Sequence, residues 1–181
     1  MHDSQDPFAM LGVERRFDLD LKVLEKTHRE LSRALHPDKY AQAGASERRA
    51  VLEKAASVNE AWRTVRDPIK RAEALFQLAG VKVGEDNEPK ATPAFLMEVL
   101  EEREALSEAR AAKDLAKVRA VGETMTKRAD LTQKKLAEGF ATMGNPPDRA
   151  AVEKLVPLLG ELRFYKRFLD EVAAIEEEND S

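Results

Sequence analysis

The chain has 181 residues, of which 43% are hydrophobic and 35% charged, and its formal net charge is −4. This length suffices for one domain or two small ones, and the composition is typical of a soluble protein rich in helix. Because the chain contains no cysteine, it has no disulfide, no thiolate zinc site, no cysteine-ligated iron–sulfur cluster and no cysteine nucleophile.

The N-terminal residues and the charge distribution indicate the expected compartment and the expected kinds of partner. The first ten residues, MHDSQDPFAM, are acidic and lack the basic and apolar regions of a secretory signal, and no apolar run is long enough to span a membrane. With no cysteine to oxidise, we expect a cytoplasmic protein without membrane association. Residues 1–80 carry 14 Lys/Arg against 13 Asp/Glu, whereas residues 81–181 carry 16 against 21. Such an acidic second half disfavours general nucleic-acid binding.

Four helices are predicted in the first half. A capping residue followed by proline, at Asp6-Pro7 and again at Asp67-Pro68, marks two helix starts, because the cap satisfies one free backbone donor and proline lacks another. Between them, two stretches with apolar residues at steps of three and four are joined by a short connection, which predicts an antiparallel hairpin. The predicted helices are Pro7–Leu11, about Asp20–Leu35 with an apolar stripe from Leu21, a helix from about Ser46 that includes Val65, and Pro68–Ala79.

The second half is predicted to be a bundle of three long helices. The Gly- and Pro-containing segment Ala79–Pro93 marks the break, and Thr92-Pro93 repeats the helix-start signal. The expected helices are Pro93–Ala112, Asp114–Met143 and Pro147–Glu178, with a turn at residues 143–148. Strand signals are weak throughout. The predicted fold class is therefore all-α, with a hairpin unit at 1–80, a linker at 81–91 and a three-helix bundle at 92–181.

The tripeptide His36-Pro37-Asp38 directly follows the first hairpin helix. It can be a plain helix stop, since His favours the helix C-terminus, Pro cannot continue the helix and Asp suits a turn. The preceding helix, however, carries a basic stripe on a face away from its leucines, and Lys39 follows the turn. The stripe consists of Lys22, Lys26, Arg29 and Arg33. A solvated face is the ordinary reading of such a stripe, but together with the turn it favours a docking edge for an acidic partner.

The motif HPDK between two amphipathic helices resembles the J-domain that stimulates DnaK-type chaperone ATPases. The segments SVNEAWRTVRDPIKRAEALFQLAG and FLMEVLEEREAL resemble the HscB-type co-chaperones of iron–sulfur cluster assembly, and this similarity covers nearly the whole chain. It implies that 1–80 is a J-domain acting on the ATPase of a DnaK/HscA-type chaperone. The implied chaperone-binding residues are His36, Pro37, Asp38, Lys39, Lys22, Lys26, Arg29 and Arg33. The Cys-based zinc module of some eukaryotic members is absent.

A second surface is predicted on the bundle. On the first bundle helix, the predicted core stripe is Phe95, Val99 and Leu106, and Met97 and Leu100 fall on the opposite side. On the third helix, Phe164 lies ~130° from the leucine stripe. Exposed apolar residues that cluster favour a partner site, although Phe164 and Phe168 can instead belong to a wider core stripe. In the HscB-type family the matching positions contact the IscU-type cluster scaffold. The implied scaffold-binding residues are Leu96, Met97, Leu100, Glu101, Glu104 and Phe164.

The resulting hypothesis is a monomeric co-chaperone that stimulates the chaperone ATPase and delivers the scaffold to it, with no catalytic residue, metal or cofactor of its own. A metal-dependent hydrolase using His36 and Asp38 would need His2 or His28 as well, and His28 lies on the leucine face, where packing is expected. A nucleic-acid-binding hairpin conflicts with the acidic bundle and the scarcity of aromatic residues. A generic J-protein with a different client is the nearest alternative, and the segment FLMEVLEEREAL disfavours it.

Overall fold

The computed structural model describes residues 6–84, 91–142 and 148–179, and in these ranges the chain is helical without any strand. The predicted all-α fold class is therefore confirmed. The elements are α1 (Pro7–Leu11), α2 (Leu21–Ala34), the 3-10 helix η2 (Pro37–Tyr40), α3 (Ala45–Arg66), α4 (Pro68–Leu78), α5 (Pro93–Ala111), α6 (Leu115–Ala141), α7 (Arg149–Glu153) and α8 (Val156–Asn179). No helix in these ranges is long and apolar enough to cross a bilayer.

The three predicted helix starts before proline are confirmed. The Asp6 carboxylate accepts a hydrogen bond from the Phe8 backbone N–H at 2.9 Å. The Asp67 carboxylate accepts from Ile69 and Lys70 at 2.9 and 3.0 Å. The Thr92 hydroxyl accepts from the Phe95 backbone N–H at 3.2 Å. In each case a side chain satisfies a backbone donor that has no partner inside the helix.

The prediction of one continuous helix over Pro147–Glu178 is wrong, because the structure has two helices there, α7 and α8. The α-helix is interrupted by a turn at Lys154 and Leu155. Pro157 explains the break, since it has no N–H for the carbonyl of Glu153 and its ring would crowd that carbonyl in a continuous helix. The Leu155 side chain instead lies over Gly139 of α6, where an added Cβ would come within 2.5 Å of it. The predicted start at Pro147 and the turn residues 143–147 lie outside the described ranges.

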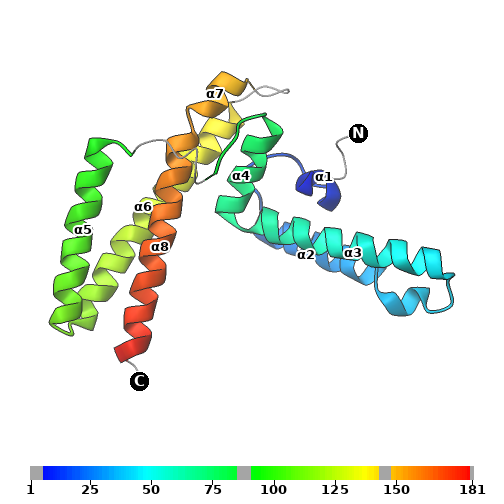
Figure 1. Ribbon diagram of the computed structural model, residues 1–181, viewed down its shortest axis with the longest axis horizontal. Helices are drawn as coiled ribbons and strands as arrows, with labels where there is room; N and C mark the ends of the chain where they lie inside the picture. The colour runs from blue at the N-terminus through cyan, green and yellow to red at the C-terminus, as the bar shows by residue number, and fades with distance from the viewer. Residues whose placement is uncertain (1–5, 85–90, 143–147, 180–181) are drawn as a thin grey trace.

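The helices α2 and α3 form the predicted antiparallel hairpin, which extends as one arm of the molecule (Figure 1). Leu24 of α2 and Val58 and Val65 of α3 are fully buried along the seam. Leu21, the first residue of the predicted apolar stripe, is half exposed, because it lies on the flank of the stripe that Leu24 centres. The buried stripe of α2 therefore begins at Leu24.

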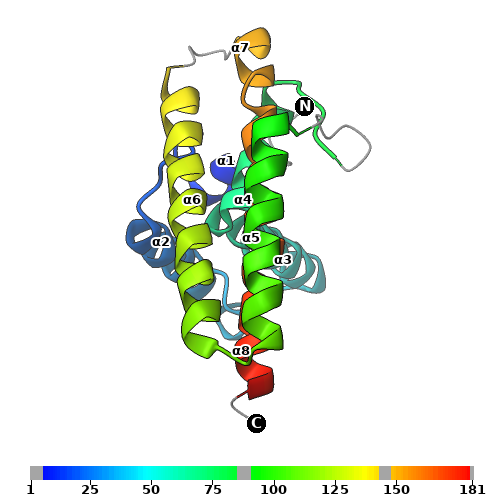
Figure 2. The ribbon, with the colours of Figure 1, turned by 90° about the vertical axis from the view of Figure 1, so that its left-hand side faces the viewer.

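The helices α5, α6 and α8 form the second arm. Figure 2 shows α5 and α6 joined by a short turn, and Figure 1 shows that they diverge toward their other ends. The core of this arm contains Leu106 of α5, Met125 of α6 and Phe168 of α8, all nearly inaccessible to solvent. An ion pair of 3.0 Å between Arg128 of α6 and Glu102 of α5 reinforces the contact. The predicted bundle is thus present, with α7 as an additional short helix.

The two arms meet in one continuous apolar core. Phe140 of α6 lies 6.0 Å from the ring of Phe17 and 5.3 Å from the ring of Phe76 in α4. Beside these rings, Arg163 of α8 pairs with Glu73 of α4 at 2.8 Å. The predicted boundaries at residues 80 and 92 stay predictions, but the hairpin unit and the bundle do not have wholly separate cores.

A buried arginine closes the base of the hairpin. Arg71 donates to the carbonyl oxygens of Val65, Phe17 and Arg66 at 2.6, 2.7 and 3.1 Å. Two of these carbonyls belong to the last turn of α3, where the helix leaves them without partners and partly negative. Burial lowers the pKa of Arg71, and the nearby Asp67 carboxylate opposes that shift. Arg71 thereby fixes the direction in which α4 leaves α3.

Replacing Asp67 by Ala should lower the free energy of unfolding by about 1 kcal/mol, because α4 loses its side-chain cap. For a chain of this size that corresponds to a fall in melting temperature of about 2–4 °C. Thermal unfolding followed by circular dichroism is the measurement. Asp67→Asn is the control, since an amide oxygen can still accept from Ile69, and it should retain most of the stability. Equal losses in both variants would assign the effect to charge and not to the cap.

Candidate functional site

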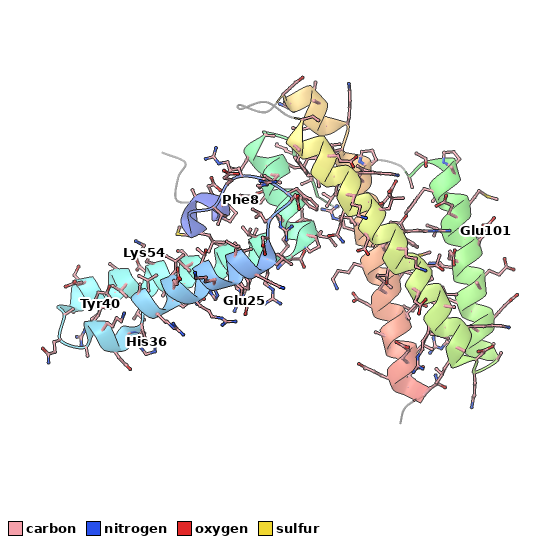
Figure 3. All side chains as sticks on the ribbon, turned by 180° about the vertical axis from the view of Figure 1, so that it is seen from behind. Phe8, Glu25, His36, Tyr40, Lys54 and Glu101 are labelled. Carbon is pink, nitrogen blue, oxygen red and sulfur yellow. The ribbon has the colours of Figure 1, made fainter. Side chains whose placement is uncertain are left out.

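The turn His36-Pro37-Asp38 forms the free end of the hairpin arm, where Figure 3 places His36. His36 caps η2, and its Nδ1 accepts from the Asp38 backbone N–H at 3.4 Å and lies 3.5 Å from Asp38 Oδ2. Pro37 occupies the first turn of η2, and the Tyr40 hydroxyl donates to the Ala34 carbonyl oxygen at 3.4 Å. The side chains of His36 and Asp38 are 59% and 90% exposed, so both are open to a partner.

The basic stripe lies along α2, on the way to this turn, and its members are exposed. Two of the four cations have carboxylate partners on the same helix: Arg29 pairs with Glu25, and Lys26 lies 4.0 Å from Glu30. Within the described residues, Lys22 and Arg33 have no such partner, and Lys39 beyond the turn has none either. The predicted chaperone-binding residues therefore form one continuous edge, only part of which carries uncompensated positive charge.

His28 is packed, as expected, and does not face the tripeptide. Its ring stacks on Trp62 of α3 with centroids 4.8 Å apart, and its Nε2 lies 2.9 Å from Asn59 Oδ1. In the described ranges, no group of three or more His, Asp or Glu side chains is arranged to hold a metal ion. His2, the other histidine considered as a ligand, lies outside those ranges.

The predicted exposure of an apolar patch on α5 is confirmed. Leu96, Met97 and Leu100 are 55%, 60% and 63% exposed, and Glu101 and Glu104 are exposed beside them. Figure 3 shows Glu101 on the bundle arm, far from His36. The predicted core residues of the same helix, Phe95, Val99 and Leu106, are partly or fully buried. Leucine and methionine side chains that remain so open to water are a feature of partner sites.

Phe164 differs from its predicted position off the core. Its ring is half buried and packs edge-on against Phe95 at 5.6 Å and against Tyr165 at 5.9 Å, and it lies 6.0 Å from Phe168. The wider core stripe, the alternative left open by periodicity, accounts for the fully buried Phe168 and for much of Phe164. Phe164 therefore joins α5 to α8.

Arg103 was missed by the sequence analysis. Its guanidinium lies 5.8 Å from the Phe164 ring centroid and pairs with Glu171 of α8 at 3.5 Å. Both partners lie more than 60 residues away in the sequence, so helical periodicity within α5 contains no signal for this arrangement. Arg103 thus extends from α5 to α8 and adds a cation to a helix whose exposed charges otherwise include Glu101 and Glu104.

Residues 91–173 match the family described as the HSCB C-terminal oligomerisation domain. The co-chaperone protein HscB homologue of Paraburkholderia phymatum is 33% identical over 92% of this chain and 89% of its own length. The homologue of Bordetella avium is 35% identical over 96% of this chain and 98% of its own. The chain belongs to the HscB co-chaperone family.

Solved HscB structures agree with this assignment. The chaperone HscB from Vibrio cholerae superposes with a TM-score of 0.80 at 27% identity and covers 97% of this chain and 99% of its own. Human co-chaperone HscB shares the fold, with a TM-score of 0.81 at 21% identity over 95% of this chain and 82% of its own. The similarity that FLMEVLEEREAL indicated is confirmed, and the fold is a J-domain followed by a helical C-terminal domain. The binding roles of individual residues stay predictions.

Proposed function

We propose that this HscB family member is a co-chaperone of iron–sulfur cluster assembly. It stimulates the ATPase of a DnaK/HscA-type chaperone and delivers an IscU-type scaffold protein to it, without catalysing a reaction of its own. The observation that carries this proposal is the placement of two exposed surfaces on separate arms. The His36-Pro37-Asp38 turn ends one arm, and the apolar patch of Leu96 and its neighbours lies on α5 of the other, the helix on which Figure 3 labels Glu101. One chain can then hold both partners at once.

At the first surface, the Asp38 carboxylate accepts a charge-assisted hydrogen bond from an arginine of the chaperone. Pro37 restricts the backbone that presents Asp38, which lowers the entropy lost on docking. The basic stripe accelerates encounter with an acidic surface on the chaperone, because opposite charges steer diffusion. The tripeptide thus acts on the nucleotide site of another protein.

At the second surface, the leucines and Met97 lose water on contact with an apolar region of the scaffold. Glu101 and Glu104 pair with cations at the rim of that region and fix the orientation of the scaffold. The half-buried Phe164 ring packs against Phe95 on the core side of α5, so α5 is held against α8 in the absence of the scaffold.

The proposal is tested by measuring ATP hydrolysis by a purified DnaK/HscA-type chaperone in single turnovers. The four reactions are the chaperone alone, with this chain, with an IscU-type scaffold, and with both. The expected results are no hydrolysis by this chain alone, stimulation by the chain, and more than additive stimulation with the scaffold. Stimulation that the scaffold does not enhance would favour a J-protein with another client.

Lys26→Ala combined with Arg29→Ala should slow association with the chaperone roughly three- to tenfold at low salt, because the edge loses two steering charges. The salt dependence of the association rate should flatten, since exposed charges are screened within a Debye length of about 8 Å at physiological ionic strength. Stopped-flow or surface-based kinetics at several salt concentrations measure both effects.

Arg49→Ala with Lys54→Ala is the matched control, because it removes two exposed cations from α3. Near-normal association is expected for the control. A change confined to dissociation in the α2 variant would mean that Lys26 and Arg29 make close contacts with the chaperone and do not act through steering.

A further inference from the structure

Two glutamates lie among the cations of the basic stripe. One surface hollow of about 380 Å³ is lined by Lys22, Glu25, Lys26, Arg29, Glu30 and Arg33. The Glu25 carboxylate accepts a hydrogen bond from Arg29 Nη2, whereas Glu30 is 4.0 Å from Lys26 Nζ. The face expected to attract an acidic partner therefore already contains two carboxylates, and the one at Glu25 is the better paired.

Glu25 also faces a cation from the neighbouring helix. The hydrogen bond and charge of Arg29 lower the pKa of Glu25, and the charge of Arg66 on α3 adds to this effect. Arg66 lies 5.6 Å from the centroid of the Trp62 ring, and Trp62 stacks on His28. The Trp62 ring therefore positions the guanidinium of Arg66, whose charge acts on Glu25. Figure 3 shows Glu25 near the base of the hairpin and His36 at its free end.

We propose that Glu25 competes with the acidic surface of the chaperone for Arg29. In the free protein the Glu25 carboxylate pairs with Arg29. On docking, a carboxylate of the chaperone replaces Glu25 as the partner of Arg29. The inference rests on the proposed function, since it requires α2 to be the chaperone-docking face. Its consequence is a slower, more reversible association than four uncompensated cations would give, because a carboxylate on the docking face repels an acidic partner.

The plainer reading is that Glu25 stabilises α2. A glutamate four residues before an arginine is the favourable order for a helical ion pair, but exposed pairs contribute little to stability. The two readings predict different changes in the rate of association with the chaperone when Glu25 is replaced. If Glu25 is a competitor, its removal accelerates association with the chaperone, whereas if it is only a helix stabiliser, its removal leaves association unchanged or slows it.

The test is the association rate of Glu25→Gln with a purified DnaK/HscA-type chaperone, at low and at physiological salt. Glutamine keeps the size of the side chain and removes its charge. Two unit charges about 4 Å apart in water interact enough to change a rate about fivefold, so a rise of about that size is expected at low salt. This increase in the association rate should become smaller as the salt concentration rises. The melting temperature should change by less than about 2 °C.

Glu53→Gln is the matched control. Glu53 pairs with Arg49 on α3 at 3.0 Å with the same i, i+4 spacing but in the reverse order, and both side chains are exposed. The substitution removes the same charge from the same arm but lies off the stripe, and an association rate within about twofold of the wild type is expected. Glu30→Gln should accelerate association less than Glu25→Gln, because its ion pair is longer.

The outcomes separate this inference from the proposed function. If the unaltered chain neither binds nor stimulates the chaperone, the proposed function is wrong, and the proposed role of Glu25 is then wrong as well. If the unaltered chain stimulates normally but Glu25→Gln associates no faster than Glu53→Gln, the inference alone is overturned. Faster association of Glu25→Gln, with a steeper salt dependence than Glu53→Gln, supports it.

Discussion

Asp38→Asn is expected to abolish stimulation of the chaperone ATPase while leaving the fold intact. The carboxylate is 90% exposed and contributes little packing, so its loss should not lower the melting temperature measurably. The amide that replaces it keeps the shape but loses the charge that an arginine of the chaperone would pair with. His36→Gln should have the same effect, because the imidazole that caps η2 also borders the docking surface. Single-turnover hydrolysis by the chaperone is the measurement.

Asp18→Asn is the control for charge. Asp18 is also strongly exposed, with Arg16 at 3.8 Å, and it lies outside both the tripeptide and the stripe. Its substitution changes the net charge equally and should leave stimulation near the wild-type level. Unchanged stimulation by Asp38→Asn would refute the assignment of the tripeptide to the chaperone.

Leu96→Ala combined with Leu100→Ala should weaken binding to an IscU-type scaffold by well over tenfold. Each leucine is a candidate hot spot, for which truncation typically costs about 2 kcal/mol or more, and even incomplete additivity leaves a large combined effect. Because both side chains are more than half exposed, the free energy of unfolding should hardly change. Isothermal titration calorimetry with the scaffold, alongside thermal melts, measures both quantities. Stimulation of the chaperone by this variant alone should persist, and its enhancement by the scaffold should be lost.

Leu52→Ala with Leu131→Ala is the matched control, because these leucines are 55% and 54% exposed but lie on other helices. Scaffold binding should be unaffected in that variant. Normal binding by a folded Leu96→Ala, Leu100→Ala variant would place the scaffold elsewhere on the chain.

Phe164 is best tested separately from the leucines. Its ring contacts Phe95, Tyr165 and Phe168, so its truncation removes core packing as well as patch surface. Phe-to-Ala changes in cores cost about 3–5 kcal/mol, and a half-buried ring should cost less. A combined loss of stability and of scaffold affinity is therefore expected for Phe164→Ala, whereas the two leucines should affect affinity alone.

Most elements of the fold could be predicted because their signals are local. An aspartate or threonine before proline fixes a helix start through backbone donors only two or three residues away, as at Asp67. The spacing of Leu24, Leu31 and Leu35 defines one face of α2 without reference to any other helix. The break between α7 and α8 has a local signal too, in Pro157, although the leucine stripe from Leu155 to Leu169 continues across it.

The chemistry of the two surfaces was also largely present in the sequence. The tripeptide at His36 and the basic residues before it are consecutive or one helical turn apart, so they share an edge in any helical fold. The exposure of Met97 and Leu100 follows from the opposite stripe of Phe95, Val99 and Leu106. The sequence therefore determined the all-α fold class, the order of the helices and both candidate surfaces.

Only the tertiary structure decided which side chains from distant segments meet. Phe140 packs between Phe17 and Phe76 and joins the two arms, and the charge of Arg66 on α3 lowers the pKa of Glu25 on α2. Helical periodicity gives the direction of a side chain about its own axis but not the position of the neighbouring helix. That position is set by the packing of whole surfaces, so the half-burial of Phe164 and the pairing within the basic stripe could be assigned only from the packed chain.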